Sequence, residues 1–327
     1  MKHSCRMATQ IAKKFLPQPP SDKVGRSGFS VTGRIAAGLI LFVCLSFLAA
    51  TAPAASDDRT LYEGDSIYHH ITIRQEGGER CMIFGRQRDL RQTCIDLAKP
   101  DASVFEYTSM MFAGFLFRPD AKKVCLIGLG GGYIPTVFRM HLPQVQLQTV
   151  EVDPHVEKLA KQYFSFAVPP GQTLAIDDGR QFLKKSRERY DQIWLDAFNS
   201  DYIPAHMTTK EFLQLAKSRL NEGGIVIQNL FCGNNLYDAQ IATFQAVFAR
   251  VFVFEGQKSG SCIIVASDRP ACEPAGLRKQ AEKWGGKIGR IDLIAEAGKC
   301  KIALAPKNAL VLTDDFNPAN LLLMQKK

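Results

Sequence analysis

The stretch that decides the fold is VCLIGLGGG, residues 124–132. Its apolar start predicts a short buried strand, and its glycines lead into a helical pattern that continues to His141. Glycine in such a loop permits positive φ angles and lets a ligand approach the backbone closely. The loop alone is also compatible with a structural turn, so its meaning depends on the rest of the chain.

Strand and helix patterns alternate after this loop. The pattern predicts strands at 145–152, 174–176, 192–195 and 225–230, and helices at 154–164, 179–188, 208–220 and 236–249. Such alternation is typical of an α/β fold, a mostly parallel sheet with helices on both faces. Two further strands, 251–254 and 262–266, are expected to close the sheet at one edge.

A different pattern precedes the loop. Apolar and polar residues alternate in three candidate strands, 66–73, 81–84 and 92–97, and a candidate helix follows at 105–117. We therefore expect a small antiparallel β domain plus helix at 56–118, followed by a nucleoside-binding α/β domain at 119–327.

The chain begins with a basic segment and an apolar one. The formal net charge is +9, and most of it lies in the tail 1–34, so it gives no argument for a nucleic-acid partner of the folded body. Residues 35–55 carry no charge and are long enough for a transmembrane anchor or a cleaved signal peptide. Both place the main domain outside the cytoplasm; a buried core helix is the remaining alternative.

The cysteines show none of the spacings typical of a zinc site, so no metal is expected. Cys81 and Cys94 stand symmetrically about a predicted turn at 87–88. They could form a disulfide in an oxidising compartment, or remain two unpaired side chains.

Acidic side chains follow the ends of successive predicted strands, which face the ligand crevice in an open α/β sheet. Glu151, with Asp153 close behind, could accept hydrogen bonds from ribose hydroxyls. Asp178, before Gly179, could accept one from an adenine amino group or cap a helix. Asp196 could hold an amine and take its proton, or serve a turn. Together they predict an adenosine-containing ligand.

Residues 62–321 resemble the polyamine aminopropyltransferases, the spermidine synthase family, and especially its bacterial spermidine-synthase-like branch. The matching stretches are collinear: 66–68, Gln92, 124–132, 150–153, 178–179, 190–196, 223–225 and 313–316. The resemblance implies a Rossmann-like S-adenosylmethionine-dependent methyltransferase fold after a small β domain. It also implies decarboxylated S-adenosylmethionine as donor and an amine as acceptor, in polyamine biosynthesis, and it leaves a homodimer open. For a bacterial protein, the apolar segment would place the main domain at the inner membrane on the periplasmic side, or free in the periplasm or secreted after cleavage.

The resemblance also assigns roles to individual positions. It makes Glu151 the ribose ligand, Asp178 the adenine ligand and Asp196 the group that activates the amine. On the donor side it also points to Gly128, Gly130, Gly132, Asp153, Gly179 and Gln92, and to His69, which stands in place of a glutamine. On the acceptor side it points to Tyr107 and to Asn199, which stands in place of an aspartate, with Asp201 as a candidate substitute for a lost acid. In this chemistry a neutral amine attacks a carbon next to a sulfonium, so the protein mainly supplies positioning and a proton acceptor.

Three carboxylates of the family pattern are missing. Gly131 stands where the glycine loop would carry an acid, Ser109 replaces a glutamate and Asn199 replaces an aspartate. A hydrogen bond to a charged group contributes roughly 1.5–3 kcal/mol. A diamine such as putrescine should therefore bind weakly unless Glu106 or Asp201 substitutes.

Two rival functions follow from these departures. Loss of the loop acid at Gly131 is compatible with a methyltransferase that uses S-adenosylmethionine itself. The second rival function is a membrane-tethered nucleoside-binding protein without catalysis. It follows from the expected location, because a domain outside the cytoplasm would not meet the usual pool of sulfonium donor.

Overall fold

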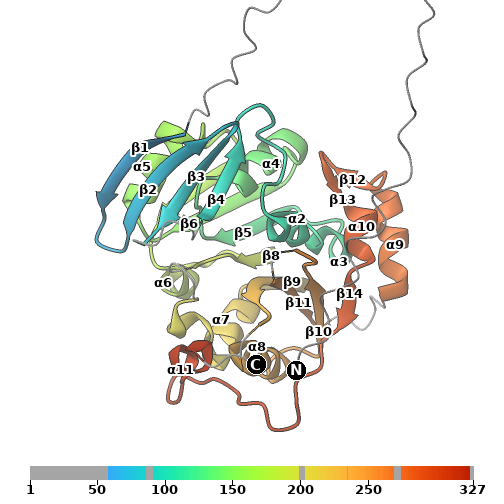
Figure 1. Cartoon of the computed structure of the whole chain (residues 1–327). Helices are drawn as coiled ribbons and strands as arrows, with labels where there is room; N and C mark the ends of the chain where they lie inside the picture. Colours follow the sequence, from blue (N-terminus) through green and yellow to red (C-terminus); the bar gives the residue numbers. More distant parts are fainter. Residues whose placement is uncertain are drawn as a thin grey trace, which may run out of the picture. The chain divides into compact units, whose positions relative to one another are not determined.

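An eight-stranded sheet lies at the centre of the fold (Figure 1). The computed structural model describes residues 58–85, 91–198, 203–233, 235–258, 260–268 and 274–324. The strand order is β14-β10-β11-β9-β8-β5-β6-β7, in which β7, β6, β5, β8 and β9 run parallel and β11 is antiparallel to both its neighbours. The strands are β5 Lys123–Ile127, β6 Gln146–Glu151, β7 Gln172–Ile176, β8 Tyr190–Leu195, β9 Leu220–Phe231, β10 Arg250–Glu255, β11 Ser261–Ser267 and β14 Cys300–Ile302. The order reverses direction between β5 and β8, which is where open α/β sheets bind ligands. The predicted Rossmann-like fold is confirmed.

Helices cover both faces of this sheet. One core cluster joins it to α2, α3, α4, α9 and α10, and a second joins its other face to α6, α7 and α8. The helices are α2 Glu106–Met111, α3 Gly114–Phe117, α4 Tyr133–His141, α5 Pro154–Tyr163, α6 Gly179–Lys185, α7 Lys210–Ser218, α8 Asn235–Gln245, α9 Pro274–Lys283, α10 Leu293–Ala297 and α11 Ala319–Met324. The remaining elements are a 3-10 turn, η1 Ala205–Met207, and a small hairpin, β12 Lys287–Ile288 with β13 Ile291–Asp292.

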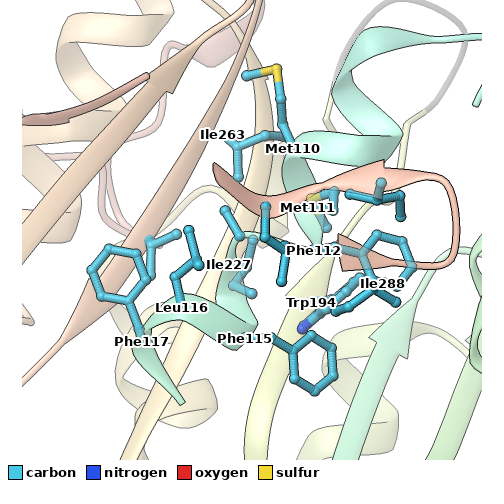
Figure 2. Packing of buried hydrophobic residues seen from close by; sticks show 14 of the residues in the cluster. Met110, Met111, Phe112, Phe115, Leu116, Phe117, Trp194, Ile227, Ile263 and Ile288 are labelled. Carbon is cyan, nitrogen blue, oxygen red and sulfur yellow. The ribbon is translucent and has the colours of Figure 1, made fainter. Parts of the chain in front are cut away.

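The helix predicted at 105–117 is split into α2 and α3, and the core explains the break. Figure 2 shows Phe112 and Phe115 beside Trp194, and the rings of Phe112 and Trp194 meet edge to face at 5.1 Å. A β-carbon on Gly114 would lie 2.2 Å from Cδ1 of Ile227, so the chain packs directly on β9 at that point. This contact holds the start of α3 against β9, and α2 lies over β9 and β11.

The small antiparallel sheet predicted ahead of the central one is present, but it has four strands where three were predicted, because β1 was missed. Its strands, in the order of the chain, are β1 Arg59–Asp65, β2 His70–Glu76, β3 Glu79–Phe84 and β4 Arg91–Asp96. The strand predicted at 66–73 begins only at His70, because the hydroxyl of Ser66 accepts the N–H of His69 at 2.9 Å and makes a turn. Of the two alternatives left open for Cys81 and Cys94, the structure has the disulfide: the two residues are opposite each other on β3 and β4 and are bonded.

This small sheet lies against α5 and the glycine loop. Ile71, Ile73 and Met82 pack with Val156 and Leu159 of α5 in one buried cluster. The contact brings β4 beside the glycine loop that follows β5, so both sheets contribute to the candidate active site.

The predicted basic tail 1–34 and the anchor or signal 35–55 lie outside the described residues. Within the described ranges, no helix combines the length and apolarity that a membrane span requires. In the same ranges no His, Cys, Asp and Glu side chains gather as metal ligands would.

Candidate active site

The glycine loop places Asp196 beside the end of β5. Gly128, Gly130 and Gly132 have φ angles of +107°, +54° and +81°, which other residues rarely adopt. A β-carbon on Gly128 would lie 2.4 Å from the carbonyl oxygen of Asp196. The N–H of Asp196 also donates to the carbonyl of Ile127 at 2.9 Å. Glycine is required here because the two strand ends touch.

Glu151 is buried at the end of β6 and faces the same loop. Its carboxylate accepts the N–H of Leu129 at 2.9 Å and the N–H of Asp153 at 3.0 Å. Burial raises the pKa of Glu151, and the two backbone N–H groups oppose that shift. A carboxylate has about four lone-pair positions, so Glu151 keeps the capacity to accept ribose hydroxyls.

Asp153 has structural partners on both carboxylate oxygens. One oxygen caps α5 by accepting the N–H of His155 at 2.8 Å, and the other accepts the hydroxyl of Ser66 at 2.5 Å. The Ser66 turn carries His69, whose ring stacks on Phe84 with centroids 4.5 Å apart and whose pKa is lowered by burial. Asp153 therefore links Glu151 to the Ser66 turn that carries His69, and a direct contact of Asp153 or His69 with a donor stays a prediction.

Asp178 combines a helix cap with an exposed partner. One oxygen caps α6 by accepting the N–H of Gln181 at 2.9 Å, and the other lies 2.9 Å from Nε2 of His206. The His206 hydrogen bond is the main reason why the pKa of Asp178 is lowered. A β-carbon on Gly179 would lie 2.4 Å from Cγ2 of Ile127, so this glycine lets α6 begin against the end of β5.

The carboxyl group of Asp196 has a pKa close to neutral pH. Its Oδ1 accepts a hydrogen bond from Nδ2 of Asn229 at 3.0 Å, and burial raises its pKa to about 7. Asn229 is only 5% exposed, and among the residues that the structure describes its own Oδ1 has no hydrogen-bond partner. Asn229 is not among the residues predicted for the site; the signal for it in the sequence is the polar pair 228–229 inside an otherwise apolar predicted strand.

Tyr107 connects the small sheet to this carboxyl group. Its hydroxyl donates to the carbonyl of Gln92 on β4 in a long hydrogen bond of 3.5 Å. Burial, and secondly the charge of Asp196, raise the pKa of Tyr107, so the phenol stays protonated. The structure thus brings Gln92, Tyr107 and Asp196 together.

The acceptor side gains no acid from Glu106. Its carboxylate accepts the N–H groups of Gln257 at 3.0 Å and Lys258 at 2.9 Å, and it pairs with Nζ of Lys299 at 3.3 Å. These partners already use the charge of Glu106, so the structure does not favour the alternative in which Glu106 substitutes for a lost acid. The predicted acceptor residues Asn199 and Asp201 lie outside the described residues.

No acid fits at Gly131 either. A β-carbon there would lie 2.8 Å from Cδ1 of Phe164 and 3.2 Å from the hydroxyl of Thr93, which accepts the N–H of Gly131 at 3.2 Å. The ring of Phe164 and β4 close the space that a longer side chain would need.

The parallel sheet, its glycine loop and the carboxylates at its strand ends define a Rossmann-like domain of the S-adenosylmethionine-dependent transferase class. The spermine/spermidine synthase domain model matches residues 104–263. A polyamine aminopropyltransferase of Vibrio vulnificus (strain CMCP6) is 33% identical over 271 residues, which cover 80% of this chain and 91% of the relative. The chain belongs to the polyamine aminopropyltransferase family.

Two more distant matches mark the limits of this assignment. A probable spermidine synthase from Corynebacterium glutamicum ATCC 13032 shares the fold with a TM-score of 0.60 and 20% identity, over 77% of this chain and 96% of that one. An eEF1A lysine and N-terminal methyltransferase of Bos taurus is 32% identical over 167 residues, which are 45% of this chain but 24% of the relative. The sequence likeness to this methyltransferase thus covers less than half of the chain.

Proposed function

We propose that the protein transfers an aminopropyl group from decarboxylated S-adenosylmethionine to an amine. The observation that carries the proposal is the Asp196 carboxyl group, with a pKa of about 7, beside a glycine loop and within hydrogen-bonding distance of Asn229. A general base works best when its pKa is near the working pH. A binding protein without catalysis has no need of a carboxyl group tuned in this way.

The proposed reaction needs one proton acceptor, and Asp196 supplies it. The amine nitrogen attacks the propyl carbon next to the sulfonium, a C–N bond forms, and the C–S bond breaks to release 5′-methylthioadenosine. The proton lost by the amine passes to Asp196. Glu151 and Asp178 hold the ribose and the adenine, so that the sulfonium carbon lies in front of the attacking nitrogen.

The acceptor in this proposal carries little positive charge beyond the reacting amine. Glu106 is neutralised by Lys299, and Gly131 leaves no room for an acid. The unpartnered Oδ1 of Asn229 is a neutral acceptor that can take one N–H of the amine. A diamine therefore loses much of the attraction that family members with more acids would give it.

A methyltransferase is the alternative that one observation favours, because no acid at Gly131 pairs with the amine of the decarboxylated donor. Titration calorimetry of the full-length protein with both donors distinguishes aminopropyl transfer from methyl transfer. We expect the decarboxylated donor to bind more tightly; a preference for S-adenosylmethionine supports methyl transfer, and no heat with either removes both enzymes.

We further propose that the folded part works outside the cytoplasm. The apolar segment 35–55 supports this, and so do the disulfides Cys81–Cys94 and Cys232–Cys262, because such bonds persist in oxidising compartments. Fractionation of the source cells, with the mass of the mature protein, tests the location and separates a cleaved signal from a retained anchor.

A further inference from the structure

The segment 313–317 contains a stretch that matches the family but has no place in the chemistry above. Its Asp314 forms a two-pronged ion pair with the guanidinium group of Arg180, with one Nη1 to Oδ1 distance of 2.7 Å. The hydroxyl of Thr209 donates to the same carboxylate at 2.8 Å, and the N–H of Asp314 donates to Glu211 at 2.9 Å. The segment is thus bonded to the starts of α6 and α7.

These contacts converge on the turn η1. Nη1 of Arg180 also donates to the carbonyl of His206 at 2.9 Å. The side-chain amide of Asn317 donates to the carbonyl of Ala205 at 2.6 Å and to the hydroxyl of Thr208 at 3.0 Å. Residues 313–317 therefore hold this turn directly at Ala205 and Thr208 and indirectly, through Arg180, at His206, and we call them the C-terminal clamp.

The turn presents one side chain toward the donor side. Nε2 of His206 lies 2.9 Å from Oδ2 of Asp178, and the other oxygen of Asp178 is fixed by the cap of α6. The side chains of His206 and Asp178 are 47% and 31% exposed, so a ligand can reach both. The orientation of the Asp178 carboxylate thus depends on His206, whose own place depends on the clamp.

We infer that His206, held by Asp314 and Asn317, is the positioning residue that lets Asp178 read the amino group of the purine. The inference rests on the proposed function, in which the donor's base lies at Asp178. A carboxylate that accepts the His206 N–H is ionised and can only accept from the ligand. It therefore attracts an amino group at the purine 6-position and repels an oxo group there.

The test compares 5′-methylthioadenosine with 5′-methylthioinosine, which differ in that one group, by titration calorimetry on the full-length protein. We expect His206→Ala to weaken binding of the adenine compound about tenfold to a hundredfold, as for the loss of one charged hydrogen bond. The hypoxanthine compound should bind almost unchanged, so the preference between the two collapses. His206→Gln, whose amide can still donate to Asp178, should restore much of the preference.

Two exposed acids of the clamp region give a matched pair. Asp314→Asn removes the charge that faces Arg180 and should reduce the preference for the adenine compound, whereas Asp315→Asn removes a neighbouring charge and should leave it intact. His70→Ala is the histidine control, because His70 pairs with Asp65 on the small sheet. Melting temperatures confirm that each variant is folded.

The possible results distinguish a failure of the role inferred for His206 from a failure of the proposed function on which that role rests. Equal weakening of both compounds by His206→Ala, or an unchanged preference, overturns the inference and leaves the donor pocket standing. If the unaltered protein binds neither compound, the proposed function fails as well.

Discussion

Nδ2 of Asn229 donates to Oδ1 of Asp196 across 3.0 Å and joins β9 to the end of β8. Burial raises the pKa of Asp196 to about 7, and the hydrogen bond from Asn229 acts in the opposite direction. The pair therefore sets the pH at which the carboxyl group begins to accept protons. A neighbouring amide can steady the carboxylate without neutralising it, which a lysine or an arginine would do.

Turnover should depend on the ionised form of Asp196. The carboxylate is the active form, so the rate should fall about tenfold for each pH unit below 7 and level off above it. Asp196→Asn should abolish turnover while the donor affinity, measured by calorimetry, changes little. Turnover that survives this substitution would reduce Asp196 to a structural residue.

Asn229→Ala should move the pH dependence upward. Removing a hydrogen bond that favours the charged form raises the pKa of the carboxyl group further, so the midpoint of the rate profile shifts to higher pH. Asn221→Ala is the matched control, because Asn221 donates to Asp191 at 2.9 Å in a similar pair away from Asp196. A midpoint that moves equally in both variants, or in neither, contradicts this role.

Local patterns were enough to predict the strand-end carboxylates. Glu151, Asp178 and Asp196 each follow an apolar strand, and parallel strands bring their carboxyl ends to one edge. The glycine loop could be recognised for the same reason, since Gly128 lies directly between strand and helix. The pairing of Cys81 with Cys94 could be named as one alternative because a hairpin places residues opposite each other, but spacing alone left the unpaired alternative open.

The remaining parts of the site depend on contacts between distant segments. No local pattern shows that Asn229 faces Asp196, or that Asp314 reaches Arg180 on another helix. The break between α2 and α3 follows from Gly114 touching Ile227 on β9. Sequence spacing predicts which residues lie at an edge, but not which of them are already paired.

The Cys81–Cys94 disulfide should stabilise the fold and support the donor loop. Cross-linking a loop of this size contributes about 3 kcal/mol by restricting the unfolded chain. A double serine variant should lose about that much free energy of unfolding in denaturant titrations without reductant. Donor affinity should fall too, because Thr93 beside Cys94 holds Gly131. An unchanged unfolding midpoint would show that the bond adds nothing.

We expect the aspartate of a Gly131→Asp variant to fit into the glycine loop only if Phe164 is also replaced by a smaller residue. Alone, the new side chain collides with the ring of Phe164, since even its β-carbon would lie 2.8 Å from Cδ1, and such overpacking costs about 1–3 kcal/mol. Phe164→Leu alone should destabilise through a cavity, whereas the double variant should be more stable than the sum of the two losses. If the missing acid explains the choice of donor, the double variant should also bind decarboxylated S-adenosylmethionine more tightly relative to S-adenosylmethionine. Additive losses, measured by denaturant unfolding, would show that Phe164 is not what excludes the acid.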